Sequence, residues 1–261
     1  MTMAQPARVR VLRRDRVVVL AALGIVALLA WTYLILEAGV RIDAAPMAMA
    51  MAMEAVSWTP RYAAVMFAMW VLMMVAMMLP GAAPMILLFA AISRRAHPGA
   101  AALRRTAGFG FAYVCVWAIF AAVATGLQWG LTRMMLLSPA MTLDSPMVSG
   151  ALFVAAGIYQ LLPVKQACLR HCRAPTEFLA SHWRTGAAGA LRMGLRHGLL
   201  CAGCCWVLMG LLFVGGIMNL VWIAALALIV FIEKAIPQGK LAGRVLAVGL
   251  VAWGATVLMF A

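Results

Sequence analysis

The sequence predicts an all-α protein, a polytopic transmembrane helix bundle with a cytoplasmic N-terminus. Of its 261 residues, 67% are hydrophobic and only 11% are charged, and the mean hydropathy is +1.03. This composition is too apolar for the surface of a water-soluble domain, which argues against a soluble enzyme, a nucleic-acid-binding domain and a disordered tail. The apolar residues also gather in runs close to the roughly 20 residues that a helix needs to cross a bilayer.

Charged residues, Pro and Gly divide the chain into about seven apolar runs, which we interpret as membrane spans. Their approximate bounds are 17–36, 62–92, 107–129, 147–162, 194–214, 218–232 and 245–260. The first run follows five arginines, as in a signal peptide, but it is too long and lacks a small-residue cleavage site, so we expect it to be retained. The runs at 147–162 and 218–232 are short for a span.

The basic residues indicate how the chain is oriented. Eighteen of the 21 lysines and arginines fall in the N-terminal segment or in alternate loops, and only Arg41, Arg61 and Arg133 fall on the other side. Because positively charged loops stay in the cytoplasm, we expect the N-terminus inside, the C-terminus outside and a multi-pass protein of the bacterial inner membrane. The net charge of +14 then reflects the membrane topology of the chain. The basic segments would also contact anionic lipid head groups.

We expect a single domain. Residues 1–16 form a basic cytoplasmic segment, and residues 17–261 form one transmembrane helical domain with a Cys/His cytoplasmic loop at 163–193. The sequence shows no Walker motif, no GxGxxG motif, no Ser/His/Asp order and no internal repeat. Any transport would therefore be passive, coupled to an ion or driven by a partner.

Cysteine and histidine concentrate in one part of the chain. Five of the six Cys and three of the four His lie between residues 168 and 205. In the first group, Cys168, His171 and Cys172, a helix would place the two cysteines one turn apart on the same face, where two thiolates can hold one soft metal ion. His182 lies in the same loop and is a weaker ligand candidate, whereas the isolated Cys115 is interpreted as an ordinary buried residue.

The second group comprises His197, Cys201, Cys204 and Cys205, at the cytoplasmic start of the 194–214 run. At about 100° per residue all four share one helix face. The cysteines would lie on the order of 10 to 15 Å inside the cytoplasmic boundary, within reach of a vestibule. A single membrane Cys is usually a small hydrophobic residue, but several on one face with a His favour metal or thiol chemistry.

A combination of motifs gives the sequence a family resemblance. The matching residues are Trp70, Met73, Ala76, Met77, Met78 and Pro80; Tyr159, Gln160, Pro163, Lys165, Cys168, His171, Cys172 and Arg173; His197, Gly198, Cys201, Gly203, Cys204, Cys205 and Trp206; Gly215, Gly216, Met218 and Asn219; and Glu233, Lys234, Pro237 and Gly239. Together they resemble the bacterial family described as predicted metal-binding integral membrane proteins, a domain of unknown function. The likeness covers most of the chain, and Leu200 departs from it where an aromatic residue is expected. The resemblance implies metal binding without fixing the metal or the activity.

Methionine provides a second group of candidate metal ligands, and the chain contains 21 of them. Met66, Met69, Met73 and Met77 occupy an arc of about 80° on the 62–92 helix, with Met74 and Met78 at its edge. Such a thioether stripe can pass Cu(I) along a helix, or it can simply pack the core.

A further set, Met47, Met49, Met51 and Met53, alternates in the preceding loop on the predicted outer side. An extended strand would point all four the same way for metal capture. A low-complexity segment lying at the membrane interface is the alternative.

Two other features of the spans have ordinary explanations that compete with functional ones. Pro80, Gly81 and Pro84 interrupt the 62–92 run at the depth of the cysteines, so a kink there could open a cavity beside the thiols or could be a plain proline kink. Glu233 and Lys234 close the 218–232 run, where we favour a snorkelling interfacial pair over a metal or proton role.

The ligand set of thiolates and thioethers with few carboxylates suits Cu(I) best, with Zn(II) as the second choice. We therefore expect an integral membrane protein that binds a soft metal, most simply for Cu(I) transport or delivery. The alternatives are a membrane thiol-disulfide oxidoreductase, which the reducing side of the membrane disfavours, and an accessory or assembly subunit with a structural metal site. The expected partners are the lipid bilayer, a metallochaperone or membrane metalloprotein, or a second copy in a homo-oligomer, and no nucleic acid.

Overall fold

A computed structural model describes residues 5–43, 58–96, 99–138, 141–235 and 239–261, and these residues form helices joined by short connections, with no strand among them. The helices are α1 (Gln5–Asp43), α3 (Pro60–Ala96), α4 (Ala100–Arg133), α5 (Pro146–Leu161), α6 (Pro163–Arg173), α7 (Pro175–His182), α8 (Gly186–Gly210), α9 (Leu212–Gly215), α10 (Leu220–Ala235) and α11 (Gly239–Met259). The all-α prediction is confirmed. Met47, Met49, Met51 and Met53 lie outside the described residues.

The predicted spans correspond to these helices, although not one for one. Among the described residues, α1, α3, α4, α8 with α9, and α11 are long and apolar enough to cross a membrane, which makes five candidate spans. A sixth is added if α5 and α6, bent by 63° to each other, form one broken span. The run at 218–232 became α10, which has only 16 residues. The number seven and the orientation therefore remain predictions.

Proline sets the starts of three helices in and before the loop predicted at 163–193. The helices α5, α6 and α7 each begin with a proline, Pro146, Pro163 and Pro175, in the first-turn position where its missing N–H costs nothing. Leu162 is extended because it precedes Pro163, and this residue separates α5 from α6. The predicted loop thus contains two short helices, and the predicted basic N-terminal segment is helical from Gln5 onward.

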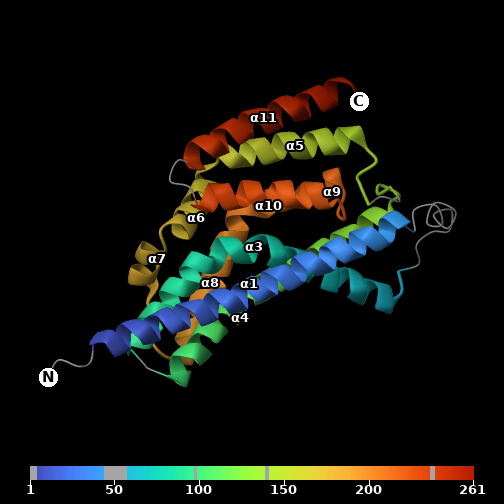
Figure 1. The fold of residues 1–261 in the computed structure, drawn as a ribbon. Helices are drawn as coiled ribbons and strands as arrows, with labels where there is room; N and C mark the ends of the chain where they lie inside the picture. Colours follow the sequence, from blue (N-terminus) through green and yellow to red (C-terminus); the bar gives the residue numbers. More distant parts are fainter. Residues whose placement is uncertain (1–4, 44–57, 97–98, 139–140, 236–238) are drawn as a thin grey trace.

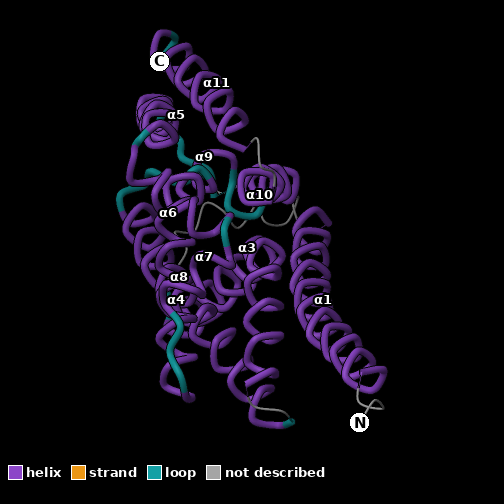
Figure 2. Tube along the Cα trace, turned by 90° about the vertical axis from the view of Figure 1, so that its left-hand side faces the viewer, coloured by secondary structure: helices purple, strands orange, loops and turns teal. Residues whose placement is uncertain are grey.

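The centre of the bundle is formed by α3 and α8, each packed against α4 (Figures 1 and 2). The helix α1 runs along α3 at one edge, while α11 lies along α5 at the other edge, with α10 between (Figure 1). Large apolar side chains of α1 and α11 are exposed, as expected of helices that face lipid. The central helices instead bury their Met and Cys side chains.

A glycine on α8 allows its close approach to α4. A Cβ atom on Gly198 would lie 2.7 Å from Cγ2 of Val116 and 3.3 Å from the carbonyl oxygen of Tyr113. Small residues allow helix backbones to pack this closely in membrane proteins. The contact turns the cysteine-bearing face of α8 toward the bundle interior.

Candidate metal centre

The helix α8 carries three buried cysteines on one face, as its spacing predicts. The exposed fractions of Cys201, Cys204 and Cys205 are 2%, 1% and 0%. The S–H groups of Cys204 and Cys205 donate to the carbonyl oxygen of Cys201 at 3.0 and 3.1 Å. These local bonds hold both thiols against the first turn of the cysteine-bearing segment.

The helix α6 brings a fourth thiol to the same place. Cys172 is half-buried, and its side chain interacts with those of Cys201 and Cys204. Cys201 in turn interacts with Cys204 and Cys205. We call Cys172, Cys201, Cys204 and Cys205 the thiol cluster.

Cys168 lies at the edge of the thiol cluster. A Cβ atom on Gly203 would lie 3.1 Å from its Sγ atom, so this glycine makes room for α6 against α8. Both cysteines of the first predicted group therefore approach α8, Cys172 more deeply than Cys168.

The sulfur atoms of the thiol cluster lie close together but are not yet arranged to coordinate one ion. Within the described ranges, no three His, Cys, Asp or Glu side chains have the arrangement of a preformed metal site. Cys204 and Cys205 turn their S–H groups to the backbone instead. Small side-chain rotations would be needed for the sulfur atoms to converge on one ion.

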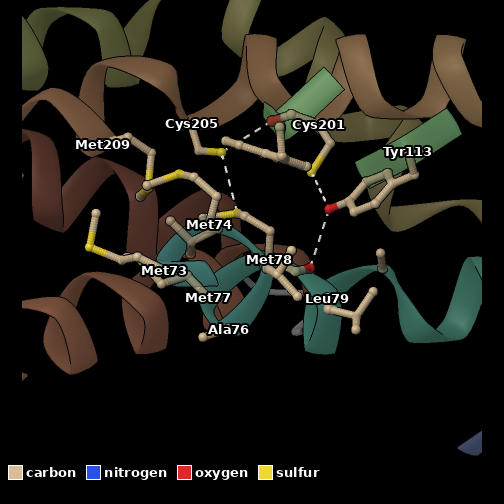
Figure 3. Packing of buried hydrophobic residues seen from close by; sticks show 14 of the residues in the cluster. Met73, Met74, Ala76, Met77, Met78, Leu79, Tyr113, Cys201, Cys205 and Met209 are labelled. Carbon is tan, nitrogen blue, oxygen red and sulfur yellow. Dashed lines mark hydrogen bonds between the residues drawn. The ribbon is translucent and has the colours of Figure 1, made fainter. Parts of the chain in front are cut away.

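The walls of the cluster come from α3 and α4 (Figure 3). The Sγ atom of Cys205 lies 3.8 Å from Sδ of Met78, and that of Cys201 lies 3.1 Å from the hydroxyl of Tyr113. The Tyr113 hydroxyl also lies 3.3 Å from the carbonyl oxygen of Met78. Met78 thus adds a thioether sulfur beside two thiols.

The stripe Met66, Met69, Met73 and Met77 lies wholly in the core, as do Met74 and Met78. Met78, at the edge of the predicted arc, accepts from the thiol of Cys205. Figure 3 shows Met73, Met74 and Met77 continuing along α3 from that point. The methionine face therefore meets the thiol cluster at one end.

Glu233 and Lys234 are buried, so the predicted snorkelling pair is wrong. Glu233 accepts from Nζ of Lys165 at 2.7 Å, and Lys165 also donates to the Gln160 side chain. Lys234 instead points at the thiol cluster, where its Nζ atom donates to Sγ of Cys201 at 3.0 Å and to Sδ of Met78 at 3.6 Å. Successive helical residues point about 100° apart, so one side chain reaches α6 and the other reaches α3 and α8.

The proline-containing part of α3 gives space to Lys234. The helix continues through Pro80 and Pro84 as one element. A Cβ atom on Gly81 would lie 3.2 Å from Cδ of Lys234, so the lysine stem fills the space that the sequence suggested as a cavity.

The histidines are not gathered with the thiols. His197 is buried and stacks near Phe109 and Tyr113, with ring centroids 6.0 and 5.5 Å away, and its Nδ1 atom has no hydrogen-bond partner among the described residues. His171 and His182 have their ring centroids 6.1 Å apart, and each Nδ1 bonds to backbone oxygen within its own helix. The predicted site of cysteines and histidines is therefore a cysteine cluster with His197 one turn away.

Sequence reasoning missed Tyr113, Met78, Lys165 and Lys234 as parts of this centre. Lys165 and Lys234 were counted as loop charges, yet both are buried. Three of the four residues belong to the motifs on which the family resemblance rests. Membership of those motifs was the signal in the sequence that could have identified them. Tyr113 had no signal, because only the packing of α4 on α8 brings it to Cys201.

The fold and the centre together define an apolar helical bundle with soft sulfur donors buried between its central helices. The chain belongs to the PpoB2 copper chaperone family, whose family model matches residues 67–257, more than half of the sequence. The matched region contains all six cysteines, Lys165 and Lys234. No curated protein and no solved structure matches the chain.

Proposed function

We propose that this protein is an integral membrane copper chaperone that takes up Cu(I) along the methionine face of α3, holds it at the thiol cluster and passes it to a partner metalloprotein. The observation that carries the proposal is the meeting of four thiols from α6 and α8 with the Met78 thioether from α3. Thiolate and thioether sulfur are the donors that Cu(I) prefers, whereas Ca(II) and Mg(II) prefer oxygen. Membership of a copper chaperone family supports the same metal.

Zinc is the second candidate, because four cysteines can also form a closed tetrahedral zinc site. The buried methionine face favours copper over zinc, since thioethers are poor zinc ligands and common ones for Cu(I). A thiol-disulfide oxidoreductase needs an accessible thiolate, and the three cysteines of α8 are almost fully buried. The burial therefore favours metal holding over redox exchange.

The test is anaerobic loading of the reduced, detergent-purified protein with Cu(I) in competition with a chromophoric Cu(I) chelator. We expect the protein to withdraw stoichiometric Cu(I) from the chelator and to release it to an acceptor protein with exposed thiols. Failure to withdraw copper, with the thiols shown to be reduced, would overturn the proposal. Copper that is bound but never released would point to a structural site in an assembly subunit.

The methionine face of α3 predicts a separable effect on copper movement. Replacing Met73 and Met77 together by Leu conserves volume and should cost less than about 1.5 kcal/mol per site in stability. We expect the double variant to keep Cu(I) at the thiol cluster but to move copper across proteoliposome membranes several-fold more slowly. Met85→Leu, a buried methionine nearer the other end of α3, is the matched control and should leave the rate unchanged.

An unchanged rate in the Met73/Met77 variant would assign the stripe to packing alone. The protein would then act by storage and delivery from one side of the membrane. Radioactive copper uptake into proteoliposomes gives the rate, and chelator competition on the same preparation gives the bound fraction.

A further inference from the structure

We propose that Lys234 makes the thiol cluster selective for a monovalent metal ion by acting as its fixed counter-cation. The inference rests on the proposed copper function and deepens it, by naming Cys201, Cys205 and Met78 as the sulfur ligands around the ion. The protein then binds Cu(I) as a neutral unit, and a divalent ion at the same ligands leaves a charge in the bundle core.

The first support is the position of the ammonium group. The Nζ atom of Lys234 lies 3.0 Å from Sγ of Cys201 and 3.6 Å from Sδ of Met78, and the latter sulfur lies 3.8 Å from Sγ of Cys205. A monocation therefore already sits where the sulfur atoms of α3 and α8 face each other. Figure 3 shows the Cys201 and Cys205 side chains of α8 beside Met78 of α3, with Cys205 reaching Met78 and Cys201 reaching Tyr113.

The second support is that no carboxylate of the described residues pairs with this lysine. Glu233, its neighbour in the chain, is paired with Lys165, and the other ion pair among the described residues joins the exposed Arg170 and Glu177. A buried ammonium without an anion is costly, so the thiol of Cys201 is the group that can supply the compensating charge.

The third support is the space reserved for the lysine stem. Gly81 on α3 leaves room for it, because a Cβ atom there would lie 3.2 Å from Cδ and 4.0 Å from Nζ of Lys234. The fold thus admits a long cationic side chain between two central helices. The hydroxyl of Tyr113 lies 3.1 Å from the same Cys201 sulfur.

The charges balance for a monovalent ion held by two thiolates. In the empty site a thiolate at Cys201 would cancel the charge of the Lys234 ammonium, whose Nζ atom lies 3.0 Å away. When Cu(I) binds, Cys205 gives up its thiol proton to solvent, and two Cu–S bonds form to thiolates while Met78 adds a neutral donor. The copper unit then carries one negative charge, which Lys234 neutralises, whereas Zn(II) at the same ligands would leave one positive charge uncompensated.

The experiment measures Cu(I) and Zn(II) affinities separately by chelator competition on the full-length, reduced protein in detergent. We expect Lys234→Gln to weaken Cu(I) and strengthen Zn(II), each by at least roughly tenfold, because a charge at this distance in a poorly solvated site has a large effect. Lys234→Arg keeps the charge and should keep the preference for Cu(I).

Gly81→Ala is a second variant that retains every charge but displaces the Lys234 stem from its position beside Cys201, because the added Cβ atom would lie 3.2 Å from Cδ of Lys234. We expect it to lower the ratio of Cu(I) to Zn(II) affinity in the same direction as Lys234→Gln. Circular dichroism melting identifies any variant that fails to fold, and the other variant then decides the question.

Stoichiometric Cu(I) binding by Lys234→Gln with the wild-type ratio of affinities would overturn the role of Lys234 and leave the copper function standing. Absence of Cu(I) binding by the wild-type protein would instead remove the copper function itself, and this inference with it.

Discussion

We expect that replacing Cys201, Cys204 and Cys205 together by serine will abolish stoichiometric Cu(I) binding. The hydroxyl group fits the space of the thiol, so the α8 face stays packed, but it offers a hard oxygen in place of the soft sulfur that Cu(I) requires. The loss of affinity should exceed the roughly 10- to 100-fold that removal of one outer-shell partner costs a metal site. Elemental mass spectrometry of the purified protein and Cu(I)-chelator competition measure the effect.

Cys115→Ser is the matched control for this variant. Cys115 is a half-buried cysteine of α4 that belongs to no cluster, so its removal should leave copper binding at the wild-type level. Copper retained by the triple serine variant would place the site elsewhere. Thiols that bind no metal but cycle through a disulfide would make an oxidoreductase the better hypothesis.

The local part of the centre could be predicted from the sequence because helical periodicity is local. The common face of Cys201, Cys204 and Cys205 follows from about 100° per residue, and the structure shows all three buried together. The one-turn relation of Cys168 and Cys172 holds for the same reason, since residues 163–173 are helical.

The other features of the centre depend on which helices pack together. The spacing of residues along one helix does not predict that packing. His197 shares the face of the cysteines but stacks against the rings of Phe109 and Tyr113 on α4. The pair Glu233 and Lys234 resembled an interfacial pair because its position at the end of an apolar run is where such pairs occur. The packing of α6 and α3 on α10 instead buries both charges, each with its own partner.

We expect Glu233→Gln to destabilise the protein by about 3–5 kcal/mol, because it leaves the ammonium of Lys165 buried without its anion. The side chains of Lys165 and Glu233 are 1% and 3% exposed, and their 2.7 Å contact joins α6 to α10. The free energy of unfolding, measured by denaturant titration in detergent micelles, should fall by this amount. Glu177→Gln is the control, since its 4.0 Å contact with Arg170 is exposed and should be worth at most about 1 kcal/mol.

The same substitution should also weaken Cu(I) binding. Breaking an ion pair far from the copper site would leave Cu(I) binding unchanged. Arg173 donates from Nε to the carbonyl oxygen of Glu233 at 2.6 Å, and Cys172 precedes it in α6. Loosening the contact between α6 and α10 therefore frees Cys172 from the thiol cluster. Replacing both members, Lys165→Met with Glu233→Leu, removes the unpaired charge and should recover most of the stability. If stability returns while Cu(I) affinity remains low, the ion pair positions α6 for copper; if both return together, its role is confined to folding.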